Sequence, residues 1–447
     1  MRTAVIGGGW AGMAAAISAH DAGHAVTVWE AARTWGGRAR KLDLQLPNGA
    51  SVRLDNGQHI LIGAYTDCLR VMRRVGLDPE SLLLRLPLEL RFPDGGGIRF
   101  PRWPAPFDAL AGIAGARGWH WTDKLALARI ALRWQWSRFR CPPDWSVARL
   151  CQGLPERVMA ELVDPLCVSA LNTVAAESSG QVFLRVLRDA MFGPRHGSNL
   201  LLPRTDLSAL FPDAAVRCLE QGGARLHPGV RIRQLAHDGR HWIVDGQAFE
   251  QVVLAAGAHD AVHVVRTSLP HVAPALRQDM QDWSDATAAL HHAAIGTVYA
   301  WAEGARLARP MLALRSTPTT DDALPAQFVF DRGHLGGPQG LLAFVVSACT
   351  GDRDALQSQV MHQGRLQLGL RLQAVATVIE KRATLACWPG LQRPAPDIAP
   401  GLLACGDYVA GPYPSTLEGA VRSGIAVIRS PASASCPRCA RHGSRPR

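Results

Sequence analysis

Residues 3–30 read TAVIGGGWAGMAAAISAHDAGHAVTVWE, and this stretch decides the fold of the chain around it. The β-branched run Thr3–Ile6 leads into three glycines, and the alanine-rich segment Met13–Ala22 follows. A second apolar run, Ala25–Trp29, ends on Glu30. The periodicity predicts strand, tight turn, helix and strand, which is the opening unit of a Rossmann-like α/β domain.

The glycines of this turn occupy the positions that a dinucleotide requires. Gly7 permits the tight turn, Gly9 lets backbone N–H groups approach a pyrophosphate, and Gly12 lets the helix pack closely on the strand. The N-terminus of the helix then faces the negative charge. Glu30, 18 positions past Gly12, is placed to accept hydrogen bonds from ribose hydroxyls. The stretch therefore predicts a dinucleotide site.

Length and composition indicate a folded chain of two or three domains. The chain has 447 residues, of which 47% are hydrophobic and 19% are charged. It contains no run of 18 uninterrupted apolar residues and no secretory signal at its start, so we expect a cytoplasmic protein. In a reducing compartment the ten cysteines are interpreted as buried or inert thiols.

The formal charge of +11 includes an arginine-rich tail. Residues 431–447 carry four arginines and no acid, so the remaining chain has a charge of +7. Their serine, proline and arginine content predicts disorder. Cys436 and Cys439 form a CxxC pair there, with only His442 beside it, so a basic tail is favoured over a zinc site and no metal ligands are assigned.

A second glycine segment follows the first strand pair. Gly36 and Gly37 precede Arg38, and this segment resembles one in the flavin amine oxidase and phytoene desaturase superfamily that leads the chain past the cofactor pyrophosphate. The resemblance implies that Gly37 and Arg38 contact the phosphates, with the arginine as a charge-assisted partner. The alternative is a surface turn with a solvated arginine.

Three further stretches resemble a narrower group, the hydroxysqualene dehydroxylases of bacterial hopanoid synthesis, also described as squalene-associated FAD-dependent desaturases. They are DNGQHILIGAY at 55–65, PLCVSALNT at 165–173 and PSTLEGAVRSG at 414–424. The resemblance implies a non-covalent FAD whose reduced form converts hydroxysqualene to squalene, and hence an external reductant. His59 is the predicted acid for the departing hydroxyl; alternatively, it only hydrogen-bonds the backbone.

Later segments predict the return of the chain to the nucleotide domain. We expect a helix at Leu207–Gln221, strands at Val230–Leu235 and His241–Val244, and a further strand with a small-residue turn at Gln251–Gly257. The superfamily resemblance implies that the backbone of Val230 binds the adenine.

The last return is a short strand, Leu402–Cys405, followed by Gly406 and Asp407. This pair resembles the motif whose carboxylate binds a ribityl hydroxyl of the flavin. The segment beginning at Leu417 predicts a helix to Ile428, whose N-terminus can stabilise charge on a reduced flavin.

The predicted architecture is α/β, with an interleaved α+β substrate domain. We assign residues 1–80, 204–270 and 397–430 to the FAD-binding domain. Residues 81–203, read as mainly helical, and residues 271–396, read as a sheet of about six strands, form the substrate domain.

One predicted helix combines basic and aromatic residues. Residues 115–140 have a net charge of +5 and four tryptophans, including Trp119 and Trp134. Its apolar residues recur at helical spacing, namely Trp121, Leu125, Ala128, Leu132, Trp136 and Phe139. This composition is typical of a helix in a membrane interface, so we expect peripheral contact with the inner face of the cytoplasmic membrane. The alternative is a helix packed on its own domain; no nucleic-acid module accompanies the charge.

Two classes of function remain open from the sequence. The first is an FAD-dependent oxidoreductase acting on an isoprenoid lipid, with a carotenoid desaturase as the second choice and an amine oxidase as the third. The second class is a non-enzymatic lipid escort, because proteins of that kind share this fold without a flavin. The presence of Glu30, Arg38 and Asp407 favours the enzyme.

Overall fold

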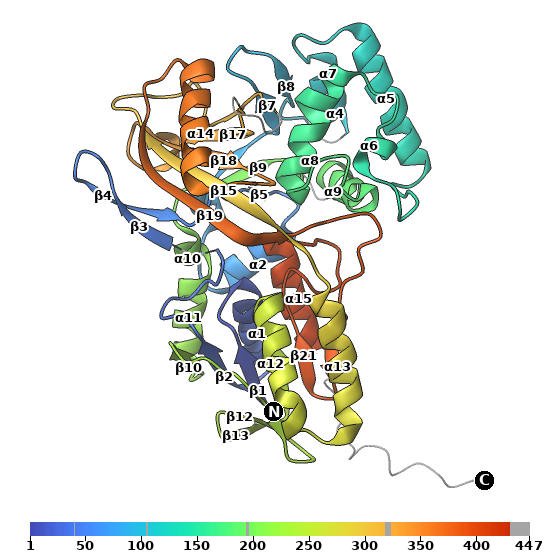
Figure 1. Cartoon of the computed structure of the whole chain (residues 1–447), viewed down its shortest axis with the longest axis vertical. Coiled ribbons are helices and arrows are strands. Elements are labelled where there is room, and N and C mark those ends of the chain that lie inside the picture. The colour runs from blue at the N-terminus through green and yellow to red at the C-terminus, as the bar shows by residue number, and fades with distance from the viewer. Residues whose placement is uncertain (40, 104–105, 194–195, 318–322, 430–447) are drawn as a thin grey trace.

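The computed structural model describes residues 1–39, 41–103, 106–193, 196–317 and 323–429. Figure 1 shows two lobes, with the N-terminal strands in the lower lobe and a long antiparallel sheet beside a helical group in the upper one. The predicted tail, with Cys436, Cys439 and His442, lies outside the described residues.

The lower lobe is built on a six-stranded sheet whose strands come from three stretches of the chain. Its order is β10 (Arg225–Pro228), β2 (Ala25–Glu30), β1 (Arg2–Ile6), β14 (Gln251–Leu254), β21 (Leu402–Ala404) and β20 (Asp397–Ala399). Neighbouring strands are parallel except for β20 with β21. This sheet confirms the α/β class and the predicted returns of the chain.

Helices α1 (Trp10–Asp21) and α15 (Leu417–Arg429) cover one face of this sheet. Val5 of β1 points into the core beneath them because alternate strand residues face opposite sides. The two helices approach closely, since a Cβ on Gly424 would lie only 2.2 Å from the carbonyl oxygen of Ala11. The N-terminal and C-terminal stretches are therefore joined in one core.

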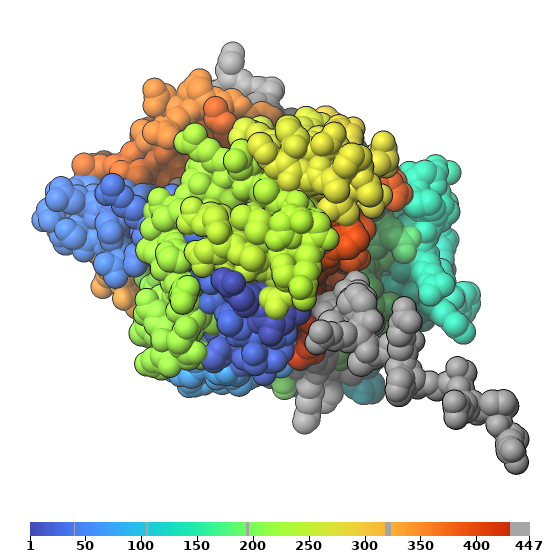
Figure 2. Space-filling model, turned by 90° about the horizontal axis from the view of Figure 1, so that it is seen from below, coloured from blue at the N-terminus to red at the C-terminus, as the bar shows by residue number. Residues whose placement is uncertain are grey.

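Helices α12 (Ala258–Ser268) and α13 (Pro274–Ala288) cover the opposite face. Figure 2, seen from below, shows α13 in yellow beside the green segment of the chain that also contains α12. Trp283 of α13 lies in the same buried cluster as β14. This helix falls within residues 271–396, so part of that segment packs on the nucleotide-binding lobe; the domain boundaries themselves stay a prediction.

The upper lobe contains a five-stranded antiparallel sheet. Its order is β16 (Met311–Ala313), β17 (Phe328–Asp331), β18 (Leu341–Val346), β15 (His292–Trp301) and β19 (Gln373–Leu385). The predicted strands near 293–301 and 341–348 are both present. Helix α14 (Arg353–Leu368), which the sequence analysis did not predict, packs on one face through Leu356 and Val360.

A helical group lies beside this sheet at the upper right of Figure 1. It comprises α4 (Phe107–Ala114), α5 (Trp121–Trp136), α6 (Val147–Leu150), α7 (Glu156–Val158), a π-helical turn (Met159–Val163), α8 (Asp164–Leu171) and α9 (Gly180–Phe192). The predicted insertion of 81–203 is therefore mainly helical over its middle part. Its two ends form short strands, namely β6 (Leu83–Leu86), β7 (Glu89–Arg91), β8 (Gly97–Arg99) and β9 (Leu200–Pro203).

The remaining elements complete the two lobes. They are β3 (Lys41–Gln45), β4 (Ser51–Asp55), β5 (Leu61–Ile62), α2 (Thr66–Arg74), α3 (Pro79–Leu82), α10 (Leu207–Leu210), α11 (Pro212–Gln221), β11 (Ala236–His237), β12 (Trp242–Val244), β13 (Gln247–Phe249) and the 3₁₀ turns Leu269–His271 and Arg332–Leu335.

The predicted strand at Val230–Leu235 is wrong. These residues run without regular structure, because β10 ends at Pro228 and Gly229 turns the chain away with φ +77°.

Candidate active site

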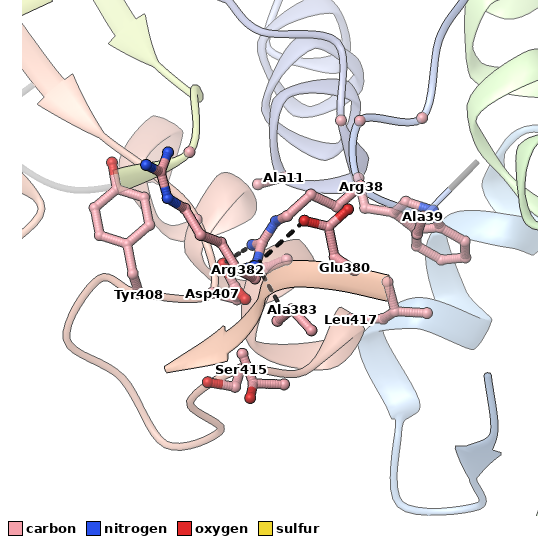
Figure 3. A pocket seen from close by; sticks show the side chains of 18 of the residues that line it. Ala11, Arg38, Ala39, Glu380, Arg382, Ala383, Asp407, Tyr408, Ser415 and Leu417 are labelled. Carbon is pink, nitrogen blue, oxygen red and sulfur yellow. Dashed lines mark hydrogen bonds and ion pairs between the residues drawn. The ribbon is translucent and has the colours of Figure 1, made fainter. Parts of the chain in front are cut away.

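A cavity of about 900 Å³ lies between the two lobes. Its lower wall includes Gly7 and Glu30, and its upper wall includes Phe328 and Phe330 of β17. Figure 3 shows the part of the cavity where Arg38 and Asp407 meet strand β19. The cavity thus brings together residues from both ends of the chain.

The glycine turn has the geometry expected from the sequence. Gly7 adopts φ +115°, and a Cβ there would lie 2.6 Å from the carbonyl oxygen of Ala255. A Cβ on Gly12 would lie 1.9 Å from the carbonyl oxygen of Gly7. Gly9 faces Gly37, whose added Cβ would lie 3.2 Å from the Gly9 Cα. A side chain at Gly7 or Gly12 would therefore clash with the backbone, and one at Gly37 would crowd Gly9.

Glu30 lies at the end of β2 and faces the cavity. Its Oε2 accepts a hydrogen bond from the Gly8 N–H (2.7 Å) and its Oε1 accepts one from the Ala32 N–H (2.8 Å). Each carboxylate oxygen has a second lone pair, so ribose hydroxyls can still donate to it. Val230 also lines the cavity, and its N–H donates to the Glu30 carbonyl (3.0 Å). This hydrogen bond involves the N–H of Val230 and not its carbonyl oxygen.

Arg38 is held by three acceptors at the edge of the cavity. Its Nη2 donates to Asp407 Oδ1, and its Nη1 donates to the carbonyls of Arg382 (3.0 Å) and Ala383 (2.8 Å) in β19. The charge of Asp407 raises the pKa of Arg38 above its ordinary value. The guanidinium therefore links the second glycine loop to the upper sheet as well as to the C-terminal motif.

The C-terminal motif is positioned by α15. Gly406 donates its N–H to Ser423 Oγ of that helix (2.9 Å). Thr416 Oγ1 accepts the N–H of Gly419 (2.9 Å), which caps the first turn of α15. Leu417, the first residue of the helix, lines the cavity. The N-terminus of α15 and the carboxylate of Asp407 therefore border the same space.

His59 lies in the cavity wall on the segment that follows β4. Its Nδ1 is 2.8 Å from the Gly57 carbonyl, which can only accept, so this nitrogen carries the proton in that bond. Burial lowers the pKa of His59, and the nearby charge of Arg38 lowers it further. The neutral imidazole therefore presents Nε2 as an acceptor, and the backbone contact that was the alternative interpretation is present.

Part of the upper wall of the cavity is apolar, whereas β19 brings Glu380 and Arg382 to another part. Ile295 of β15, Phe328 and Phe330 of β17 and Val345 of β18 line it. Thr297 of β15 lies in the same wall and is buried, and its hydroxyl has no partner among the described residues. The apolar part fits a hydrocarbon chain that carries few polar atoms.

A polar network behind His59 was missed by the sequence analysis. Arg332, which is 5% exposed, donates from Nη1 to Gln58 Oε1 (3.1 Å). Tyr299 donates its hydroxyl to the Asp55 carbonyl (2.9 Å), and burial raises the pKa of the Asp55 carboxyl to about 7. No local motif marks Arg332, because its partner is 274 positions away.

Two residues within the quoted stretches have structural partners. Asn172 ends α8 with φ +50°, donates to Thr384 Oγ1 (2.8 Å) and accepts from the Ala348 N–H (2.6 Å). Glu418 is fully buried, and it accepts the N–H groups of Asp67 and Cys68 at the start of α2. These residues join elements that surround the cavity.

The residues present fit a dinucleotide. Glycines form both loops of the lower wall, and the N-terminus of α1 faces the cavity. Along this wall, Glu30 and Asp407 supply hydrogen-bond acceptors and Arg38 supplies a donor. This is the donor and acceptor set that ribose, pyrophosphate and a polyol chain require.

Comparison with known families identifies the class. Residues 10–427 match the family model of flavin containing amine oxidoreductases, so the chain belongs to that family. A flavin in a dinucleotide site is FAD, and the protein is an FAD-dependent oxidoreductase. Two solved structures have the same fold. An oxidoreductase from Methanosarcina mazei matches with a TM-score of 0.68 and 16% identity, over 96% of this chain and 100% of that protein. A reduced UDP-galactopyranose mutase matches with a TM-score of 0.64 and 13% identity, over 96% of this chain and 94% of that protein.

Individual curated proteins give a more specific comparison than the family model does. The chain is 28% identical to the hydroxysqualene dehydroxylase of Sinorhizobium fredii over 94% of this chain and 95% of that protein. It is 26% identical to the hydroxysqualene dehydroxylase of Rhodopseudomonas palustris, over 94% of this chain and 96% of that protein. A zeta-carotene desaturase of Synechocystis is 36% identical, but over only 28% of this chain and 26% of that protein.

Proposed function

We propose that this protein is a hydroxysqualene dehydroxylase, which reduces hydroxysqualene to squalene in squalene and hopanoid biosynthesis. The observation that carries the proposal is the match to two proteins of that name along almost their whole length, whereas the carotene desaturase matches about a quarter of its length. The apolar part of the upper wall, with Phe328 and Phe330, supports an isoprenoid over a polar amine as substrate.

We assign the cofactor to the lower wall of the cavity. The residues that would hold FAD are Gly7, Gly9, Gly12, Glu30, Gly37, Arg38, Val230, Gly406, Asp407 and Leu417. Bound there, reduced FAD supplies a hydride and is left oxidised, so an external reductant must restore it.

The reaction balances as the loss of hydroxide and the gain of hydride at one allylic carbon. The C–O bond breaks, a proton joins the departing hydroxyl to form water, and the hydride completes the new C–H bond. The residues of the upper wall, such as Phe328 and Phe330, exclude water that would recapture the allylic cation.

We propose His59 Nε2 as the atom that holds the proton for the departing hydroxyl. Nδ1–H is fixed on the Gly57 carbonyl, so only Nε2 is available to the cavity. The donating form is the imidazolium, and burial lowers the pKa of His59, so this form is populated at lower pH than for an exposed histidine. Gln58 and Arg332 position this segment through their hydrogen bond.

We propose that the enzyme takes its substrate from a membrane through α5. The stripe of Trp121, Leu125, Leu132 and Trp136 is exposed, with 77% and 85% exposure for the two tryptophans. Leu127, Ile130 and Trp134, by contrast, are buried, as is Trp119 just before the helix, so α5 has apolar residues on two faces and packs through only one of them. No helix in the described ranges is long and apolar enough to span a bilayer. The contact proposed is therefore peripheral, on the inner face of the cytoplasmic membrane.

The reaction is tested anaerobically. Photoreduced enzyme is mixed with hydroxysqualene, and flavin reoxidation is followed together with squalene by mass spectrometry. We expect one squalene for each flavin reoxidised. The proposal is wrong if the flavin stays reduced with hydroxysqualene. If the oxidised enzyme then turns over a carotenoid precursor or an amine, the protein is a carotenoid desaturase or an amine oxidase instead.

A further inference from the structure

A shallow hollow of about 590 Å³ lies where α5 ends against α9. It is separate from the cofactor cavity and shares no lining residue with it. Its walls are Gln135, Arg138, Phe139, Arg140, Arg188, Asp189 and Phe192. Three of these seven side chains are guanidinium groups, so its chemistry differs from that of the apolar stripe beside it.

The arginines of the hollow are poorly neutralised. Arg138 and Arg140 are exposed, and neither has an ion-pair partner among the described residues. Arg188 uses Nε to bond Asp189 Oδ1 (3.0 Å), which leaves its terminal nitrogens available. The hollow therefore has more donors than the protein itself satisfies.

The single acid in the hollow is already compensated. Asp189 accepts hydrogen bonds from the Tyr413 hydroxyl (2.6 Å), Arg185 Nε (2.6 Å) and Arg188 Nε (3.0 Å). Burial raises the pKa of Asp189, but these three bonds outweigh it and hold the pKa below its ordinary value. The carboxylate therefore stays ionised and bound, and it does not compete for Arg138 or Arg140.

The hollow continues the exposed stripe of α5. Trp136, at 85% exposure, lies two residues before Arg138. The rings of Phe139 and Phe192 pack 5.2 Å apart in its wall, and Phe192 is 44% exposed. A cationic hollow with an apolar rim is complementary to a lipid that has an anionic head and an apolar body.

We propose that this hollow binds the phosphate of an anionic phospholipid headgroup, with Arg138 and Arg140 as its main donors and Arg188 as a third. The guanidinium forks suit a phosphate, since each can donate two parallel hydrogen bonds. The proposal rests on the peripheral membrane contact proposed above. It adds a defined headgroup site to the diffuse attraction of a basic surface.

The test compares two variants that remove the same charge from the same region. Arg138→Gln with Arg140→Gln alters the hollow, and Arg129→Gln with Arg133→Gln alters the exposed side of α5 outside it. Each holoenzyme is sedimented with vesicles of phosphatidylcholine alone or mixed with phosphatidylglycerol. Diffuse attraction predicts the same loss for both, roughly fivefold per arginine. The headgroup site predicts a larger loss for the hollow variant, roughly tenfold or more per arginine.

Two further measurements distinguish a headgroup site from general charge attraction and from a site for free phosphate. Arg138→Lys with Arg140→Lys keeps the charge but not the fork, and we expect it to stay weaker than the wild type. Titration of the wild type with inorganic phosphate, without vesicles, is expected to show no saturable binding.

Equal losses in the two glutamine variants, full recovery with lysine, or tight binding of free phosphate would each overturn the headgroup site while leaving the membrane contact intact. A wild type that does not sediment with either vesicle would overturn both. None of these results depends on the reaction that the enzyme catalyses.

Discussion

Arg38 and Asp407, which are 369 positions apart in the chain, form an ion pair at the edge of the cofactor cavity. The pair joins the loop after the first βαβ unit to the loop before the last helix. Arg38 also bonds two carbonyls of β19, so one guanidinium connects its own loop to two other parts of the chain. Both residues are assigned to FAD, and this gives the first prediction.

Substituting Glu30, Arg38 or Asp407 by alanine is expected to weaken FAD binding by about 1–3 kcal/mol each, because each change removes a hydrogen bond that involves a charged group. The measurement is titration of the apoprotein with FAD, followed by flavin fluorescence. Arg149→Ala, which breaks the exposed pair with Asp144, is the control and should bind FAD like the wild type. Wild-type protein that takes up no flavin would contradict the cofactor assignment itself.

The rate of dehydroxylation by the reduced enzyme is expected to fall as the pH rises. Burial lowers the pKa of His59 below 6.5, so the donating imidazolium is lost above that lowered pKa. His59→Gln should lower the rate by roughly 10²–10⁴ and remove this dependence on pH. A single-turnover pH profile measures it. An unchanged profile in the variant, with normal flavin content, would assign the proton to another group.

Asp55→Asn is expected to make stability less dependent on pH. Burial raises the pKa of the Asp55 carboxyl from 3.8 to about 7 in the folded protein, so between these values the folded state binds more protons than the unfolded state. The free energy of unfolding therefore decreases as the pH rises across this window, by up to about 4 kcal/mol. Asparagine cannot ionise and can still accept the Leu207 N–H. Urea unfolding at pH 5 and pH 8 tests this; an equal decrease in both proteins would show that Asp55 is not the cause.

Replacing Trp121 and Trp136 by serine is expected to reduce vesicle binding by about tenfold per tryptophan, because each indole loses apolar area that would be buried in the interface. Leu366→Ser is the control, because Leu366 is an apolar residue that is 59% exposed on helix α14, outside the α5 stripe. Co-sedimentation gives the partition coefficients. If the tryptophan and leucine variants bind alike, the stripe of α5 is not the contact surface.

Much of the nucleotide-binding lobe could be predicted because its signals are local. The turn around Gly7 and the pair Gly406 and Asp407 lie directly next to the strands that they follow. Strand β15 could be recognised from its own composition. Val230 was misjudged as a strand residue because apolar residues alternate with arginines over residues 230–233, whereas Pro228 and Gly229 end the pairing.

The sequence by itself determined the fold class and the dinucleotide nature of the cofactor, because glycine conformation and strand periodicity act over a few residues. Tertiary structure alone decided that Arg332 supports the segment of His59 and that Asn172 ties α8 to the upper sheet. It also decided which apolar face of α5 is buried, since Trp134 packs inside while Trp136 does not. Both residues have the same side chain, so only the packing of the surrounding helices distinguishes them, through the apolar area that each one removes from water.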